Sequence, residues 1–84
     1  MLQTTSNDFD AYFGRGSVLT NMGRLNEALT DFNTAIRLNP YNRQAYRFRA
    51  VVYQRLARVE TNLQRYFEYL RMAENDLRTA STLE

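Results

Sequence analysis

Residues 9–42 of this 84-residue chain are FDAYFGRGSVLTNMGRLNEALTDFNTAIRLNPYN. Apolar residues recur there at steps of three and four in two runs, the spacing of an amphipathic helix. The first run covers residues 9–22 and the second covers residues 25–38. Gly23 suits the position just past a helix end, and Pro40 ends the second run because its nitrogen lacks the proton that a helix needs. Two such helices joined by so short a turn predict an antiparallel hairpin.

The hairpin also carries the residue pattern of a known repeat. Small residues stand where the two helices would cross, large ones surround the crossing, and a proline closes the unit: Tyr12, Arg15, Gly16, Leu19, Ala28, Phe32, Ala35 and Pro40. In this pattern the stretch resembles a tetratricopeptide repeat, a helix–turn–helix unit of about 34 residues. Only Arg15 departs clearly, because leucine is common there. The resemblance implies an all-α fold of three or four helices, a role in binding proteins, and no chemistry of its own.

A second, altered unit follows. The pattern of the first helix returns 34 residues later at Tyr46, Arg49, Ala50 and Tyr53. The pattern of the second helix returns eleven residues too late, with Ala73-x-x-Asp76-Leu77-x-x-Ala80 repeating Ala28-x-x-Asp31-Phe32-x-x-Ala35. The surplus corresponds to residues 60–70. Because eleven residues make about three helical turns, the insertion keeps the apolar face in phase. The resemblance therefore predicts a long C-terminal helix.

An apolar seam runs through this second part of the chain. From Val52 to Ala80 it proceeds by alternating steps of four and three, and leucines recur every seven residues at Leu56, Leu63, Leu70 and Leu77. Such spacing is typical of a coiled coil. The seam predicts a face that packs against another helix.

Residues 43–80 contain no glycine or proline, so the sequence is compatible with either one helix or two. A single helix would span about 57 Å at 1.5 Å per residue, which is very long for so small a domain. The alternative is a break near residues 57–61, with Thr61 and Gln64 as a capping box. We favour the break, and the single helix stays open.

The ends of the chain are polar. We expect residues 1–8 to be frayed, with Asn7 or Asp8 capping the first helix, residues 9–80 to form one domain, and residues 81–84 to be a tail that ends like a cloning scar. No signal-like segment and no apolar run of membrane length is present. A cytoplasmic protein without membrane contact is expected.

Composition excludes much chemistry. The chain has no cysteine and no histidine, which rules out disulfides, thiolate metal sites and histidine-based catalysis. No nucleophile and base are paired by spacing, and no glycine-rich phosphate loop is present. We therefore predict no enzyme activity, no metal site and no cofactor.

The overlong second unit points to self-association. A stack of two repeats leaves apolar faces open at its ends, and about three repeats are usually needed for stability. A homo-oligomer, with a symmetric dimer favoured, would cover them. The predicted contact residues are Leu56, Val59, Leu63, Tyr66, Phe67, Leu70 and Leu77.

The alternative is a monomeric adaptor that binds an acidic or extended peptide in the groove typical of the repeat. Every basic residue is an arginine, and residues 37–58 hold six of them and no acid. Internal neutralisation explains this charge as well as a partner does. The groove candidates are Phe13, Ser17, Asn21, Arg47, Val51 and Arg55. The carboxylate clamp of chaperone-binding members is absent, because aromatic residues and a serine stand at its positions.

Nucleic acid is the weakest of the partners considered. On a continuous helix four arginines would fall within about 60° of one another: Arg43, Arg47, Arg58 and Arg65. Tyr41 lies nearby for stacking. However, Glu60 and Glu68 follow, and no RNA-binding module is recognisable. Nucleic acid binding is therefore not expected.

Overall fold

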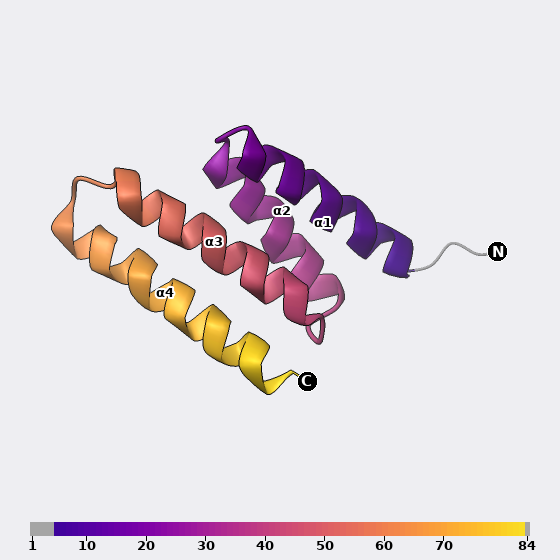
Figure 1. The fold of residues 1–84 in the computed structure, drawn as a ribbon. Coiled ribbons are helices and arrows are strands. Elements are labelled where there is room, and N and C mark those ends of the chain that lie inside the picture. The colour runs from indigo at the N-terminus through magenta and orange to yellow at the C-terminus, as the bar shows by residue number, and fades with distance from the viewer. Residues whose placement is uncertain (1–4, 84) are drawn as a thin grey trace.

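The computed structural model describes residues 5–83, and the side chains of residues 8–83. Within them the chain forms four α-helices and no strand: α1 (Thr5–Asn21), α2 (Leu25–Leu38), α3 (Arg43–Val59) and α4 (Leu63–Thr82). Figure 1 shows two antiparallel hairpins side by side, α1 with α2 and α3 with α4. The order of the helices makes α1 and α3 run in the same direction. The predicted all-α fold of helix–turn–helix units is confirmed.

The first hairpin closes where the sequence predicts. Gly23 has a φ of +80°, a conformation that favours glycine, and Arg24 N donates to Leu19 O at 2.9 Å across the turn. Gly16 lies at the helix crossing, where a Cβ atom would stand 3.0 Å from the ring of Phe32. The glycine is needed there because it lets the aromatic ring approach the backbone of α1.

Both ends of the helical region extend further than expected. α1 begins at Thr5, so the predicted cap at Asn7 or Asp8 is wrong. α4 continues to Thr82, which lies within the predicted tail. Polar residues extend a helix without being buried, because each backbone amide bonds a carbonyl one turn away. Their polarity therefore did not mark the ends. Residues 1–4 and residue 84, which belong to the expected frayed end and the scar, lie outside the described residues.

The favoured break between the last two helices is confirmed, but its cap is not the predicted one. Asn62 caps α4, and its side-chain oxygen accepts a hydrogen bond from Arg65 N at 2.9 Å. The capping box at Thr61 and Gln64 is therefore wrong by one residue. Asparagine is the stronger cap, and from residue 62 its side chain reaches the amide three residues on.

The eleven extra residues are shared by both helices of the second hairpin. α3 ends at Val59, four residues beyond the equivalent of Asn21, and α4 begins seven residues before the equivalent of Leu25. The expectation that the surplus lengthens the last helix alone is therefore wrong. In an antiparallel hairpin one helix can gain turns against its partner only if the partner also lengthens.

We expect Asn62→Ala to lower the free energy of unfolding by about 1 kcal/mol, the usual contribution of an asparagine cap. Thr61→Ala is the matched control, because Thr61 is next to Asn62 and its own exposed side chain caps no helix. Urea denaturation of both variants measures the difference. If Thr61→Ala lowers the free energy of unfolding more than Asn62→Ala does, the capping box expected from the sequence is the true cap.

The core lies where α3 covers the first hairpin. Phe32 and Val52 are fully buried and pack with Ala28 and Leu56. A second buried cluster takes one residue from each of α1, α2 and α3: Phe9, Ala35 and Ala45. Among the four helices, the arrangement leaves one side of α4 without a neighbour (Figure 1).

Candidate interaction surfaces

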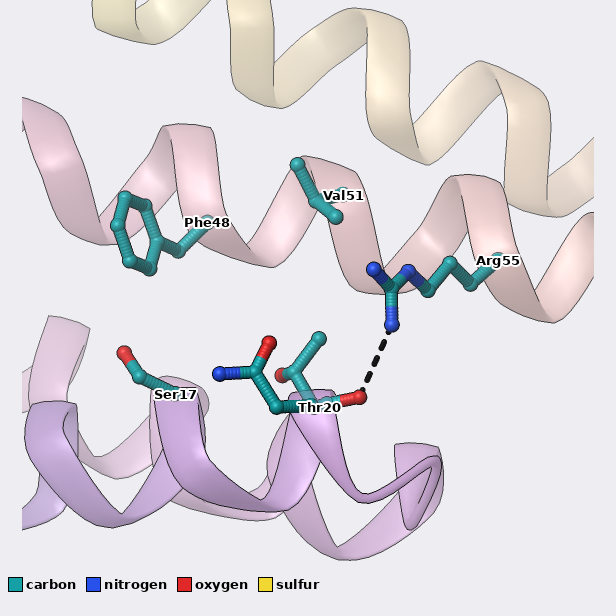
Figure 2. A pocket seen from close by; sticks show the side chains of 6 residues that line it. Ser17, Thr20, Phe48, Val51 and Arg55 are labelled. Atoms are coloured by element: carbon teal, nitrogen blue, oxygen red, sulfur yellow. Dashed lines mark hydrogen bonds between the residues drawn. The ribbon is translucent and has the colours of Figure 1, made fainter.

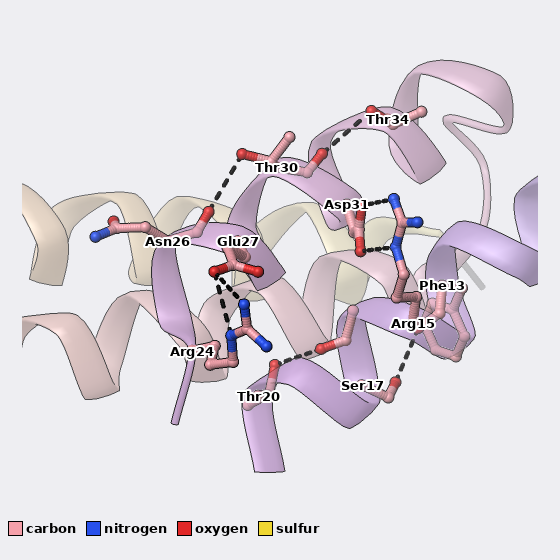
Figure 3. A network of polar contacts seen from close by, with 11 residues as sticks. Phe13, Arg15, Ser17, Thr20, Arg24, Asn26, Glu27, Thr30, Asp31 and Thr34 are labelled. Carbon is pink, nitrogen blue, oxygen red and sulfur yellow. Dashed lines mark hydrogen bonds and ion pairs between the residues drawn. The ribbon is translucent and has the colours of Figure 1, made fainter. Parts of the chain in front are cut away.

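Each hairpin is tied by an arginine–aspartate pair at equivalent positions. Arg15 Nε and Nη2 donate to the two carboxylate oxygens of Asp31 at 2.7 and 2.8 Å (Figure 3). Arg49 Nε and Nη2 donate in the same way to Asp76 at 2.9 and 2.7 Å. Arg15, which departs from the repeat pattern, is thus paired rather than out of place. The signal was in the sequence, because both units carry arginine and aspartate at these positions.

These pairs also raise the pKa of their two arginines. The hydrogen bonds that Arg49 donates to Asp76 raise the pKa of Arg49, and those that Arg15 donates to Asp31 raise the pKa of Arg15. Burial beside the second pair raises the pKa of Tyr53. A bidentate pair that is already satisfied offers no site for a partner. The pairs are therefore structural.

A groove lies between α1 and α3. It holds a pocket of about 230 Å³ lined by Ser17, Thr20, Asn21, Phe48, Val51 and Arg55 (Figure 2). Arg55 Nη1 crosses it and donates to the backbone oxygen of Thr20 at 3.0 Å. Phe48 and Val51 make the α3 side of the pocket apolar and Arg55 makes one end basic, a combination that suits an extended peptide.

The structure brings together four of the six predicted groove residues: Ser17, Asn21, Val51 and Arg55. Phe13 is instead half-buried, with its ring centroid 4.9 Å from that of Phe48. Arg47 is not among the residues that line this pocket and lines another, between α3 and α4. Thr20 and Phe48 also line the groove. The helical spacing of Thr20 with Ser17 is the sequence feature that indicates Thr20 as a groove residue.

The outer face of α4, defined by Leu63, Phe67, Leu70 and Leu77, is apolar and exposed. These four side chains are between 37 and 68% exposed. They follow one another at steps of four, three and seven, so they lie along one side of the helix. Beside them Tyr66 is half-buried, with its ring centroid 5.2 Å from that of Phe67.

The predicted seam is not one face, and two of its members show why. Leu56 is buried in the core against the first hairpin, so it is removed from the predicted self-association surface. Val59, at the end of α3, is exposed. Within α4 the seam positions Ala73 and Ala80 are buried, whereas the leucines lie on the outer face. The helix break and the two neighbours of α3 separate positions that one uninterrupted helix would align.

The arginine row considered for nucleic acid is also interrupted. Arg43, Arg47 and Arg58 belong to α3, but Arg65 follows the break on α4 and has Glu60 at 3.9 Å. A continuous basic face over all four residues therefore does not form. That hypothesis loses its geometric basis.

Two pairs of antiparallel helices, stacked with equivalent contacts, define a helical repeat protein. Residues 9–42 match the family model described as Tetratricopeptide repeat, and the four-helix fold fits this type of repeat. Such repeats generally mediate protein–protein interaction and are typically not catalytic. No curated protein and no solved structure matches the chain significantly.

Two searches of the described residues were negative. No group of three or more acidic side chains is arranged to hold a metal ion between residues 5 and 83. In the same part of the chain no helix is long and apolar enough to cross a membrane.

Proposed function

We propose that this chain is a non-catalytic protein–protein interaction scaffold that self-associates, with the outer face of α4 in the contact. The observation that carries the proposal is the exposure of Leu63, Phe67, Leu70 and Leu77 along one side of a helix. Contiguous apolar surface of this kind marks contact sites in proteins. Val59 and Tyr66 would extend the surface at its edges.

Self-association also meets a stability need of a small chain. A domain of this size buries a modest share of its unfolded surface and has neither disulfides nor metal ligands of the thiolate or imidazole type. Small folds often gain stability by forming oligomers. Covering the outer face of α4 would add buried apolar area where α4 has no neighbour. A dimer is the smallest assembly that does so.

We expect light scattering on a sizing column to give a mass well above 9.9 kDa that falls on dilution. The variant Leu63→Glu/Leu70→Glu should give 9.9 kDa at every concentration, because each glutamate would be buried without a partner in the contact. Met72→Glu is the matched control. Met72 is equally an exposed apolar residue of α4, but it lies about 180° around the helix from Leu63.

Circular dichroism checks that both variants keep the wild-type helix content. A wild-type mass of 9.9 kDa over the whole concentration range would contradict self-association. The same is true if Met72→Glu dissociates the assembly as fully as the double variant does.

The second candidate function is that of a monomeric adaptor for an acidic or extended peptide. The groove between α1 and α3 favours it, because Phe48 and Val51 are exposed there and Arg55 adds positive charge. Arg47, expected as a second basic contact, does not line this pocket. A monomeric wild-type protein would leave the adaptor as the better proposal.

A further inference from the structure

The contact between the two hairpins is itself a model for a contact between chains. α3 packs on the first hairpin through four residues of one face: Ala45, Phe48, Val52 and Leu56. Ala45 packs with Phe9 and Ala35, and Val52 packs with Phe32 in the buried core. The packing uses small residues at one end of the face and large ones at the other.

The same face exists on α1 and has no neighbour among residues 5–83. The residues 34 positions before those of α3 are Ala11, Gly14, Val18 and Met22, which we call the front face. All four are exposed, and the two large side chains, Val18 and Met22, are more than half exposed. A helix at a protein surface usually turns its apolar stripe toward the core, so this second, exposed row is available for a contact with another chain.

The surface that would receive this face exists on the second hairpin. Phe13 corresponds to Arg47, 34 positions later, and Phe32 corresponds to Leu77, 45 positions later. Phe32 is 0% exposed because α3 covers it, whereas Leu77 is 44% exposed. We call this surface the back face, defined by Arg47, Leu70, Leu77 and Ala80.

A pocket on the back face marks the place of the missing neighbour. It measures about 270 Å³ and is lined by Arg43, Arg47, Leu77, Ala80 and Ser81. The equivalent place in the first hairpin is filled by Ala45, which packs there against Phe9 and Ala35. Ala11 of another chain is the residue that the repeat would put into this pocket.

Charge favours the same arrangement. Asp8 and Asp10 are exposed at the start of α1, and Arg47 is exposed near the start of α3. α1 and α3 run in the same direction (Figure 1). A copy of α1 stacked in the place that the repeat predicts would therefore have Asp10 at the same end of the contact as Arg47. Within residues 8–83 no salt bridge joins Arg47 to an acid of its own chain. Opposite charges at the two faces would also select this orientation of the copies.

We propose that a second copy of this chain docks its front face on the back face, so that α1 of one copy packs on α3 and α4 of the other as α3 packs on the first hairpin. The inference rests on the proposed self-association and specifies its geometry. Because the two faces differ, the contact is head-to-tail and leaves one front and one back face open. The assembly therefore extends beyond two copies, as a ring or an open chain, in contrast to the symmetric dimer expected from the sequence.

The test blocks one face at a time. Val18→Glu removes the front face and Leu77→Glu removes the back face, and each variant alone should give a mass of 9.9 kDa by light scattering. An equimolar mixture should give a heterodimer of twice 9.9 kDa that does not grow further, because the first variant keeps its back face and the second keeps its front face. Met72→Glu, mixed with either variant, controls for nonspecific effects of the added charge.

Three outcomes would overturn the head-to-tail contact in different ways. If Val18→Glu keeps the wild-type mass while Leu77→Glu is monomeric, a symmetric contact of α4 with α4 forms, and the proposed function survives. If the wild type associates but the mixture stays at 9.9 kDa, the copies meet through other faces. If the wild type is monomeric at all concentrations, the proposed function fails as well, and something other than a second copy covers α4.

A charge exchange tests the contact without touching the apolar residues. Asp10→Arg and Arg47→Glu should each weaken association about three- to tenfold, because like charges would then face one another. Mixing the two variants should restore the wild-type concentration midpoint of association. In the mixture, the new arginine of one variant meets the new glutamate of the other. Weakening without restoration in the mixture would contradict the pairing of Asp10 with Arg47.

Discussion

Phe32→Ala is expected to remove most of the protein's free energy of unfolding at room temperature. Phe32 is fully buried at the junction of three helices, with its ring centroid 5.8 Å from that of Phe13 and 6.1 Å from that of Phe48. Truncating a buried phenylalanine costs about 3–5 kcal/mol. A domain of this size has a free energy of unfolding near the lower end of about 5–15 kcal/mol, so little stability would remain. Circular dichroism during thermal and urea unfolding measures the loss.

The repeat supplies a matched control for this variant. Leu77→Ala changes the equivalent position of the second hairpin, where the side chain is 44% exposed because no further helix covers it. At concentrations where the protein is monomeric we expect a loss below about 1 kcal/mol, since a partly exposed side chain loses less transfer free energy. Equal losses from Phe32→Ala and Leu77→Ala in the monomer would contradict the burial that separates the two positions.

Arg49→Met is expected to lower the free energy of unfolding by about 3 kcal/mol, because it leaves a buried carboxylate without its partner. The side chain of Asp76 is 5% exposed and that of Arg49 is 20% exposed. Arg49 Nη1 also donates to Asn33 Oδ1 at 2.9 Å, and this bond joins the second hairpin to the first. The loss therefore affects the α3–α4 packing and the contact between hairpins together. Urea denaturation at neutral pH measures it.

Two further variants separate the charge from the packing. Arg49→Met/Asp76→Leu should recover much of the lost stability, because no unpaired charge remains in the protein. Arg15→Met, at the equivalent position of the first hairpin, should cost less than Arg49→Met, since the side chain of Arg15 is 65% exposed and keeps more of its hydration. A double variant that is no more stable than Arg49→Met would mean that the arginine acts through its stem and its bond to Asn33.

Local features of the chain were readable before the structure. The bounds of α2, the turn at Gly23 and the close approach at Gly16 depend on backbone conformation and on spacing within a few helical turns. The loop between α3 and α4 was expected within two residues of its place, although its cap was not. These features follow from residues that are near one another in the sequence, which is where pattern and propensity carry information.

The surfaces were less readable, because a helical stripe tells which residues share a side but not what covers that side. Four of the predicted groove residues line one pocket, Ser17, Asn21, Val51 and Arg55, whereas Arg47 lines another. Arg47 lies less than a quarter turn around α3 from Val51, and that small rotation directs it toward α4. Spacing alone does not resolve such a difference.

The sequence by itself determined that this protein is a stack of helical hairpins with a tetratricopeptide-type first unit. Helical periodicity, small residues at the crossing and helix-ending residues are all local properties. Only the tertiary structure decided that Leu56 belongs to the core and Leu77 to the surface, although both occupy the same heptad seam. The physical reason is that α3 has a neighbour on each side, whereas α4 has one. Burial depends on those neighbours and not on the period of the pattern.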